Sequence, residues 1–490
     1  MKLSRSGKAS LILLLAVLLG FARSSLATLS DYKAIQSEGS VTYWPRVDVT
    51  VNTGKTIGSN NLSLGFMVDF DWKTWRDRSI LRELAQNASY KLVRMFDFRK
   101  NPPLVPCTSW NESTKTGTWN WTDLDLLVQR IFEIGAEPLF ALGTTLTPMT
   151  NYIPSGMAVD PTTGLPYPAS WAAYCREWPK HFKNTGVPVR FYETMNEPWM
   201  YFGWNDYSKI SNFMNLFNAA AQAMKSEDPN ILISFDGTNR KPVLDYWLAN
   251  GGAELGFISF HKYDSGTIDY YSDATMLDRA ETFQLKTSLS YYGVKDAPQK
   301  YYDARGKRIP VINSESNFNS VCDAGTDPKI QQFVGAVWEA LVLRTEILEG
   351  ADYNIYYSFS SSASWEKTSK TSGGLGFGMI NSDNNHPWYP YYVQEMLGRS
   401  LSVGDTLLES ISNSSDVRVL SWVHEGNAKV MLIGKTTQVL RVFLTGITGN
   451  MNVTKIDTTI PWETPSIQKS EISLDEPVIM NGYSVILLEP

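Results

Sequence analysis

Eight apolar runs rich in β-branched and aromatic residues recur along the first three quarters of the chain, and helical patterns lie between them. The runs are residues 62–70, 90–98, 137–145, 189–198, 231–238, 256–263, 309–317 and 353–360. The helical patterns include residues 75–88, 124–135, 207–226 and 331–348. Strands that alternate with helices form βα units and a parallel sheet. Eight such units predict an α/β fold, a (β/α)8 TIM barrel over residues 61–400.

A doubly wound open sheet can be built from the same βα units. In its dinucleotide-binding form, that fold carries a glycine-rich phosphate loop after the first strand. No such loop follows any of the eight runs. The pattern therefore favours the closed barrel.

The pattern changes after the last helical segment, residues 386–401. Short alternating runs follow, which are typical of an antiparallel β-sandwich domain. They are residues 417–425, 428–435, 438–446, 452–459 and 483–490. We therefore predict a C-terminal β-sandwich domain over residues 401–490. Residues 40–52 alternate in the same way, so the N-terminal segment 28–60 is predicted to pair with that domain.

The first 27 residues have the organisation of a secretion signal. Lys2, Arg5 and Lys8 precede an apolar run of 12 residues, 11–22, and small residues follow it. That run is short for a bilayer span, so residues 1–27 are predicted to be a cleaved signal peptide. An uncleaved membrane anchor is the alternative. We expect a secreted, extracellular protein with no membrane association after cleavage.

Charge and cysteine content narrow the class of partner. The formal net charge of −6 gives no support for binding to nucleic acid. The chain has three cysteines, Cys107, Cys175 and Cys322, which allow one disulfide without specifying the pair. No Cys/His spacing indicates a metal site, and we expect no metal or cofactor. Six Asn-x-Ser/Thr triplets permit glycosylation, at Asn61, Asn87, Asn111, Asn120, Asn413 and Asn452.

Functional side chains of a TIM barrel lie at the carboxyl ends of its strands. The fourth strand ends at Asn196-Glu197-Pro198, and the seventh ends at Glu315. These two strands lie on opposite sides of a barrel mouth, so Glu197 and Glu315 can converge across it. Two convergent carboxylates suit the cleavage of a glycosidic bond, because one protonates the leaving oxygen and the other attacks the anomeric carbon or activates water.

The stretch from Trp171 to Trp199 resembles the fourth-strand region of clan A glycoside hydrolases, most closely family 39, which contains β-xylosidases and α-L-iduronidases. Arg94 in KLVRMF, the FISFHKY run at residues 257–263 and Glu315 in VINSESN support the resemblance. It covers the barrel and is expected to extend to the β-domain. The serine and asparagine after Glu315, and Trp199 after Asn-Glu-Pro, depart from the family pattern and leave the sugar open.

The resemblance implies a role for each matching residue. Glu197 would be the general acid/base and Glu315 the nucleophile. Asn196 would bind the 2-hydroxyl of the reacting sugar. Two further residues would act on the nucleophile, Tyr263 by holding it and Arg94 by keeping it ionised.

Other residues are candidates for substrate contacts. His261 would line the site near Glu197, with a satisfied core histidine as the alternative. Trp199 and Trp365 are candidate sugar platforms, and core packing is the alternative for both. Glu193 is expected deeper in the barrel, bonded to a basic or hydroxyl neighbour.

Together these features predict a retaining hydrolase of β-linked plant-type saccharides, either xylan-like or glucan-like. An exo-acting β-glucosidase or glycolipid hydrolase, and a non-catalytic carbohydrate-binding barrel, are the alternatives. The oligomeric state is left open.

Overall fold

The computed structural model describes most of the chain beyond its N-terminal region. The described residues are 34–37, 40–68, 71–96, 104, 106–144, 153–203, 206–266, 271–282, 291–320, 329–362, 376–461 and 463–490. The predicted signal peptide, Cys322 and Trp365 lie outside them. Within the part of the chain that is described, none of the helices combines the length and apolar character needed to cross a bilayer.

Eight parallel strands form the barrel, each within a predicted apolar run or extending slightly beyond it. Neighbouring strands pair in the order β10-β9-β8-β5-β4-β13-β12-β11. The strands are β4 (Ser63–Val68), β5 (Leu92–Met95), β8 (Glu137–Ala141), β9 (Phe191–Glu193), β10 (Leu232–Ser234), β11 (Ile258–Ser265), β12 (Val311–Asn319) and β13 (Tyr353–Tyr356). The predicted (β/α)8 barrel is confirmed.

The ring of strands closes between β10 and β11. The backbone N–H of Gly256 donates to the carbonyl of Ile233 over 2.7 Å, and Ser234 Oγ donates to the carbonyl of Phe257 over 2.7 Å. Just beyond the strands, Gly237 N–H donates to the carbonyl of Ser259. These bonds fix the end of β10 against β11, and both strands carry side chains into the mouth.

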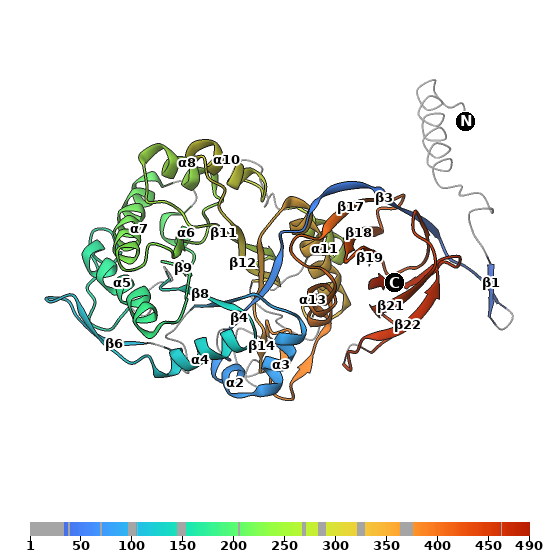
Figure 1. The fold of residues 1–490 in the computed structure, drawn as a ribbon, viewed down its shortest axis with the longest axis horizontal. Helices are drawn as coiled ribbons and strands as arrows, with labels where there is room; N and C mark the ends of the chain where they lie inside the picture. Colours follow the sequence, from blue (N-terminus) through green and yellow to red (C-terminus); the bar gives the residue numbers. More distant parts are fainter. Residues whose placement is uncertain are drawn as a thin grey trace, which may run out of the picture.

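Helices cover the outside of the barrel, and two of them also face the β-domain. They are α2 (Trp72–Asp77), α3 (Ser79–Asn87), α4 (Thr122–Glu133), α5 (Pro168–Thr185), α6 (Trp199–Phe202), α7 (Tyr207–Glu227), α8 (Lys241–Asn250), α9 (Asp273–Ala280), α10 (Asp296–Arg305), α11 (Phe333–Glu349) and α13 (Tyr389–Ser400). Figure 1 shows α11 and α13 between the barrel and the β-domain.

The helix predicted over residues 75–88 is two helices in the structure, α2 and α3. Arg78 separates them with φ −96° and ψ 116°, which is extended backbone. Its guanidinium donates to the carbonyl of Ser382 and to the side chain of Asn385. The break lets this side chain reach a distant turn that a continuous helix would not present to it.

The β-domain is built around one sheet of nine strands and confirms the predicted C-terminal β-domain. Eight strands come from the C-terminal part of the chain, and β3 comes from the N-terminal segment and lies beside them in Figure 1. They are β3 (Arg46–Ser59), β17 (Thr406–Ser412), β18 (Val417–His424), β19 (Asn427–Gly434), β20 (Val439–Thr445), β21 (Asn450–Asp457), β22 (Gln468–Ser473), β23 (Val478–Asn481) and β24 (Ser484–Glu489).

The pairing of β3 is the one exception to the antiparallel pattern of that sheet. It runs antiparallel to β17 and parallel to β20. Val47, Val49 and Val51 alternate inward from β3 and join the apolar core of the domain.

Three smaller sheets lie apart from these two. Two are hairpins, β1 (Ala34–Ser37) with β2 (Ser40–Tyr43) and β6 (Cys107–Asn111) with β7 (Thr116–Trp119). The third is formed by β14 (Ser360–Ser361), β15 (Ile380–Asn381) and β16 (His386–Pro387).

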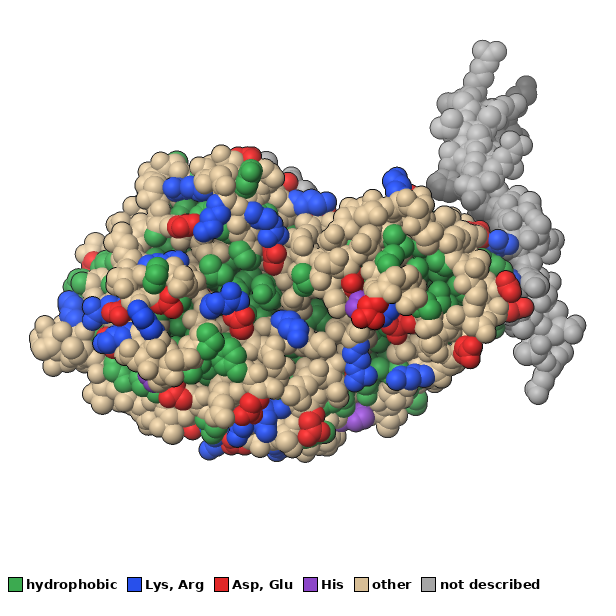
Figure 2. All heavy atoms as spheres, in the orientation of Figure 1, with side chains coloured by type: hydrophobic (Ala, Val, Ile, Leu, Met, Phe, Trp, Pro, Cys, Tyr) green, Lys and Arg blue, Asp and Glu red, His purple; other side chains and the backbone are tan. Residues whose placement is uncertain are grey.

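The interface between barrel and β-domain is polar as well as apolar. Trp422 Nε1 donates to the carbonyl of Ser400 over 2.8 Å, and Arg344 Nε donates to the carbonyl of Val419 over 2.8 Å. Arg418 and Lys435 both pair with Glu281. Figure 2 shows Lys and Arg interspersed with Asp and Glu over the face that it draws.

Two carboxylates are buried beneath the barrel wall on α11. Gln394 donates to Glu339 Oε1 over 2.7 Å, and Asn313 donates to Glu346 Oε1 over 2.7 Å. Burial raises the pKa of each carboxyl to about 8. A buried carboxyl that is held neutral acts as a hydrogen-bond donor as well as an acceptor.

These two groups make stability depend on pH in a stated direction. The folded-state pKa of Glu339 exceeds its unfolded value, so its contribution is fully present below about pH 4.5 and is lost as pH rises through about 8. Glu339→Gln keeps the shape and removes the titration. We expect this variant to lose less free energy of unfolding than the wild type between pH 5 and 9, by on the order of 3–5 kcal/mol. Urea unfolding across that range measures the difference, and parallel pH profiles would contradict the assignment.

Candidate active site

The mouth of the barrel gathers charged and polar side chains from four strands and from the turn after a fifth. Arg94 comes from β5, Glu193 from β9, Asp236 from the turn after β10, His261 and Tyr263 from β11, and Glu315 from β12. Asn196 and Glu197 follow β9. All project from the carboxyl ends of parallel strands, which is where barrels carry function.

Arg94 is the centre of the network and is fully buried. Its Nη1 donates to Glu315 Oε1 over 2.6 Å, and its Nη2 donates to Glu193 Oε2 over 2.7 Å and to Asn196 Oδ1 over 2.6 Å. Glu193 also accepts from Ser259 Oγ over 2.5 Å. Glu193 therefore lies deeper in the barrel with a basic and a hydroxyl partner.

An irregularity in β12 directs Glu315 into the mouth. The register between β11 and β12 shifts, so that Phe260 pairs with Asn313 but His261 pairs with Glu315. The extra residue is Ser314. A bulge of this kind re-aims side chains and is common beside active sites. Ser314 and Glu315 are consecutive yet both face inward: Ser314 Oγ contacts Ser259 Oγ at 2.8 Å, and Glu315 contacts Arg94.

Glu197 reaches the mouth through a strained turn. Strand β9 ends at Glu193, five residues before the end of the predicted run 189–198, because the chain turns at Asn196-Glu197-Pro198. Glu197 has φ 46°, in the left-handed region that is unfavourable for a residue with a side chain. Such strain costs about 1–3 kcal/mol and concentrates at functional sites. The backbone N–H of Asn196 donates to the carbonyl of Gly143 over 2.6 Å and fixes the turn.

The structure brings the two predicted catalytic carboxylates together. An oxygen of Glu197 and an oxygen of Glu315 lie within 4.8 Å of each other, and His261 Nδ1 lies between them. It is 3.2 Å from Glu197 Oε1 and 3.4 Å from Glu315 Oε2. Tyr263 OH donates to Glu315 Oε2 over 2.6 Å. The imidazole is therefore part of the site.

The charges at the mouth shift the pKa values of Glu315 and His261 in opposite directions. Burial alone would raise the pKa of Glu315, but His261, Arg94 and the Tyr263 hydroxyl outweigh burial and hold the pKa below its ordinary value. Burial alone would lower the pKa of His261, but Asp236, Glu315 and the hydrogen bond with Glu197 raise it to about 9. At neutral pH the site therefore holds an ionised Glu315 beside a charged imidazole.

Asp236 is a site residue that sequence reasoning missed. It is buried, and its Oδ1 lies 3.6 Å from His261 Nε2. Burial raises the pKa of Asp236 to about 7, against the opposing charge of His261. The signal was present, since Asp236 stands near the end of the predicted strand 231–238 and the rule of reading strand ends includes it.

Of the two tryptophans predicted as sugar platforms, the structure describes only Trp199. Trp199 begins α6, and its ring packs against the guanidinium of Arg240 at 4.7 Å from the ring centroid. Tyr291 packs on the same guanidinium at 5.0 Å. Trp199 therefore lies next to the turn that carries Glu197, and its ring packs against Arg240. Trp365 lies outside the described residues.

Glu197, His261 and Glu315 are also the one group among the described residues whose geometry could hold a metal ion. A cation there would have to displace the proton that His261 holds with a pKa of about 9. The cation would also be repelled by the guanidinium of Arg94, which is already bonded to the Glu315 carboxylate. The chemistry of this donor set therefore favours proton transfer over metal binding.

The cysteine prediction is settled in part. Cys175 is a free thiol buried in α5. Cys107 is buried at the start of β6, and its possible partner Cys322 lies outside the described residues. The sequence allows one disulfide without specifying its pair, and the pair stays open.

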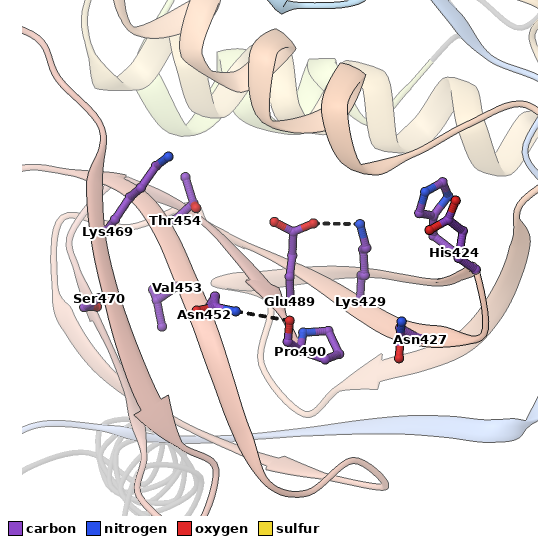
Figure 3. A pocket seen from close by; sticks show the side chains of 11 residues that line it. His424, Asn427, Lys429, Asn452, Val453, Thr454, Lys469, Ser470, Glu489 and Pro490 are labelled. Carbon is purple, nitrogen blue, oxygen red and sulfur yellow. Dashed lines mark hydrogen bonds and ion pairs between the residues drawn. The ribbon is translucent and has the colours of Figure 1, made fainter.

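A hollow in the β-domain lies apart from the barrel mouth. It has a volume of about 480 Å³ and is lined by polar and charged side chains, among them Lys429, Glu489 and Asn452. Figure 3 shows the ion pair between Lys429 and Glu489, whose charged atoms are 2.7 Å apart. The hollow shares no residue with the mouth of the barrel.

Comparison with solved structures places this fold. A β-xylosidase from Caulobacter crescentus CB15 superposes with a TM-score of 0.63 at 15% sequence identity, covering 90% of this chain and 99% of that one. The structural match is to glycoside hydrolases. A GH39 enzyme from Xanthomonas axonopodis pv. citri gives a TM-score of 0.59 at 15% identity, with 90% and 97% covered. An α-L-arabinofuranosidase from Thermotoga maritima gives 0.60 at 14% identity, with 91% and 100% covered.

Sequence comparison alone finds no relative. No protein-family model matches the chain, and no curated protein matches it. The resemblance to family 39 drawn from short motifs is confirmed by the structural match for the fold of barrel and β-domain together. Activity and substrate are a separate question, which the geometry of the mouth addresses.

Proposed function

We propose that this protein is a secreted retaining glycoside hydrolase that cleaves β-glycosidic bonds. The observation that carries the proposal is the approach of Glu197 and Glu315 to within 4.8 Å in unlike surroundings. Carboxyl groups about 5–5.5 Å apart serve a double displacement through a covalent intermediate, whereas inverting enzymes need about 6.5–9.5 Å. Carboxylate oxygens within 4.8 Å of each other support the shorter of these two separations.

Each carboxylate has a role that follows from its contacts. Glu315, held ionised by Arg94 and Tyr263, attacks the anomeric carbon while Glu197 gives its proton to the leaving oxygen. The glycosyl ester then removes the charge of Glu315. Glu197, now ionised, takes a proton from water, and that water releases the sugar with its original configuration.

Asn196 is oriented for a sugar hydroxyl. Its Oδ1 accepts from Arg94 Nη2, so the N–H groups of the amide Nδ2 are the ones available to donate to a sugar hydroxyl. A hydrogen bond to the 2-hydroxyl that strengthens in the transition state supplies several kcal/mol of rate acceleration. This arrangement supports the substrate contact proposed for Asn196.

For the substrate we propose a neutral, β-linked plant-type saccharide, xylan-like or glucan-like. The structural neighbours include a bifunctional glucanase-xylanase as well as the β-xylosidase, which supports both backbones. An exo-acting β-glucosidase or glycolipid hydrolase is the alternative. The N-terminal pattern of residues 1–27 supports secretion.

A substrate screen tests the function directly. We expect hydrolysis of at least one among nitrophenyl β-xylosides and β-glucosides, xylan, mixed-linkage glucan and cellulose. Release of single sugars from chain ends indicates exo action, and oligosaccharides indicate endo action. An enzyme that binds these saccharides but hydrolyses none of them would favour a carbohydrate-binding barrel.

The role of Glu197 has its own test. Glu197→Ala removes the proton donor, so aryl glycosides with poor leaving groups should slow by about 10²–10⁴-fold. Glycosides with activated leaving groups should form the glycosyl ester with little loss. Steady-state rates across a leaving-group series measure the difference. Equal losses for all leaving groups would contradict an acid role.

A further inference from the structure

His261 connects three carboxylates through its two ring nitrogens. Nδ1 faces Glu197 Oε1 and Glu315 Oε2, at 3.2 Å and 3.4 Å. Nε2 faces Asp236 Oδ1 at 3.6 Å. The ring is nearly buried, with 7% of its side chain exposed. Nδ1 has a hydrogen-bond partner in Glu197, whereas Nε2 has none among the described residues. Nε2 faces the Asp236 carboxylate at an ion-pair distance, so the negative charges on both sides of the ring favour its doubly protonated form.

The position of Asp236 is unfavourable for the stability of the fold. It is 1% exposed, and among the described residues its Oδ2 has no hydrogen-bond partner. A buried polar group left in this state is destabilising, because it has lost its hydrogen bonds to water. The nearest positive charge to which the structure pairs it is His261. Its position is fixed by the turn in which Gly237 and Thr238 N–H groups both donate to the carbonyl of Ser259 on β11.

We propose that Asp236 is a positioning residue that holds His261 doubly protonated, so that one Nδ1–H serves whichever of Glu197 and Glu315 is ionised. This inference rests on the proposed function, because it follows the charge through the two displacement steps. Asp236 itself touches neither sugar nor reacting atoms in this account.

The charge moves between the two acids that His261 faces. In the first step Glu315 bonds to the anomeric carbon, the bond to the leaving oxygen breaks, and the proton of Glu197 goes to that oxygen. Glu315 is then a neutral ester and Glu197 a carboxylate. In the second step water bonds to the carbon, its proton returns to Glu197, and Glu315 leaves with its electron pair. One negative charge thus passes from Glu315 to Glu197 and back.

The other groups around His261 are arranged differently. Arg94, from β5, and Tyr263, from β11, are bonded to Glu315. Arg240, after β10, carries a positive charge that interacts with Asp236 and Glu197. His261 is the charged donor that contacts both Glu197 and Glu315. A donor 3.2 Å and 3.4 Å from the two acids can stabilise each in turn with little movement.

Histidine NMR tests the inference without relying on turnover. The chain has four histidines, so ¹³Cε1 labelling gives four ring signals, and loss of one in His261→Asn assigns it. We expect His261 of the wild type to titrate near pH 9. In Asp236→Asn the midpoint should fall by one pH unit or more. A wild-type His261 that titrates below pH 7 would overturn the inference, whether or not the variant folds.

Kinetics supply the second readout. In Asp236→Asn the high-pH limb of kcat should move to lower pH, and kcat should fall about tenfold for substrates limited by release of the glycosyl enzyme. Glu339→Gln is the matched control, since it removes another buried carboxyl with a raised pKa that lies outside the mouth. It should leave both the His261 titration and the pH profile unchanged.

The outcomes separate this inference from the proposed function. Unchanged His261 titration and unchanged kcat limb in a folded Asp236→Asn would overturn the role of Asp236, even in an active enzyme. Absence of hydrolysis by the wild type would overturn the proposed function and, with it, the role assigned to Asp236 in the two steps. The same shift of both readouts in Glu339→Gln would show a general effect of removing any buried titrating carboxyl and would also overturn the role of Asp236.

Discussion

Glu315→Ala should abolish hydrolysis, lowering kcat by about 10⁴-fold or more. The substitution removes the attacking oxygen and leaves a space beside Arg94 and Tyr263, two groups that are placed to hold an anion. Azide can occupy that space and attack an activated β-glycoside from the face that Glu315 used. We expect azide to restore part of the rate and to give the α-glycosyl azide, identified by proton NMR of the product.

The neighbouring residue gives the control for this prediction. Ser316 is buried, and its Oγ has no hydrogen-bond partner among the described residues. Ser316→Ala should therefore retain activity within a few fold. Activity in Glu315→Ala that equals the wild type, or rescue that yields a β-azide, would contradict the role of Glu315 as nucleophile.

Arg94→Met should damage stability and activity together. Arg94 is fully buried and contacts Glu193 and Glu315 at 2.7 Å and 2.6 Å. Removing one partner of a buried ion pair leaves uncompensated charge and costs about 3–5 kcal/mol. The loss of Arg94 also raises the pKa of Glu315, because this guanidinium is one of the groups that keep the carboxyl ionised. Urea unfolding and kcat/KM against pH measure the two effects, and the acid limb of activity should move to higher pH.

A double variant separates folding from catalysis. In Arg94→Met/Glu193→Gln the second carboxylate partner of Arg94 is neutral, so part of the lost stability should return. Activity should stay low, by about 10²-fold or more, because Glu315 still lacks its guanidinium. An Arg94→Met enzyme as stable and as active as the wild type would show that the buried network does not support the site.

The barrel was predictable because its signal is repeated eight times in the sequence. Each barrel strand, from β4 to β13, falls within one of the apolar runs or extends a few residues past its end. Helix α5 was less visible, since Pro179 lies inside it and a proline normally ends a helix. Burial of that face against α7 outweighs the lost hydrogen bond. Strand β22 was missed because it is mostly polar, β23 because it has only four residues, and β17 because Glu and Ser residues interrupt its apolar pattern.

The site was predictable in outline for a different reason. The position of a residue at a strand end places it in the mouth, and this rule found Arg94, Asn196, Glu197, His261, Tyr263 and Glu315. The rule does not report contacts. It could not show that Arg94 joins Glu193 to Glu315, that a bulge at Ser314 turns Glu315 inward, or that Asp236 faces the far side of His261. Those facts depend on strand register, which a single sequence does not specify.

The measurement that tests the shared use of Glu197 and Glu315 most directly is proton NMR of the first product formed by the wild-type enzyme. An oxygen of each carboxyl lies within 4.8 Å of the other, so a β-glycoside should release the β-anomer first, and the α-anomer should appear only afterwards by mutarotation. Release of the α-anomer first would mean that water attacks the anomeric carbon directly, and it would contradict the role of Glu315 as nucleophile.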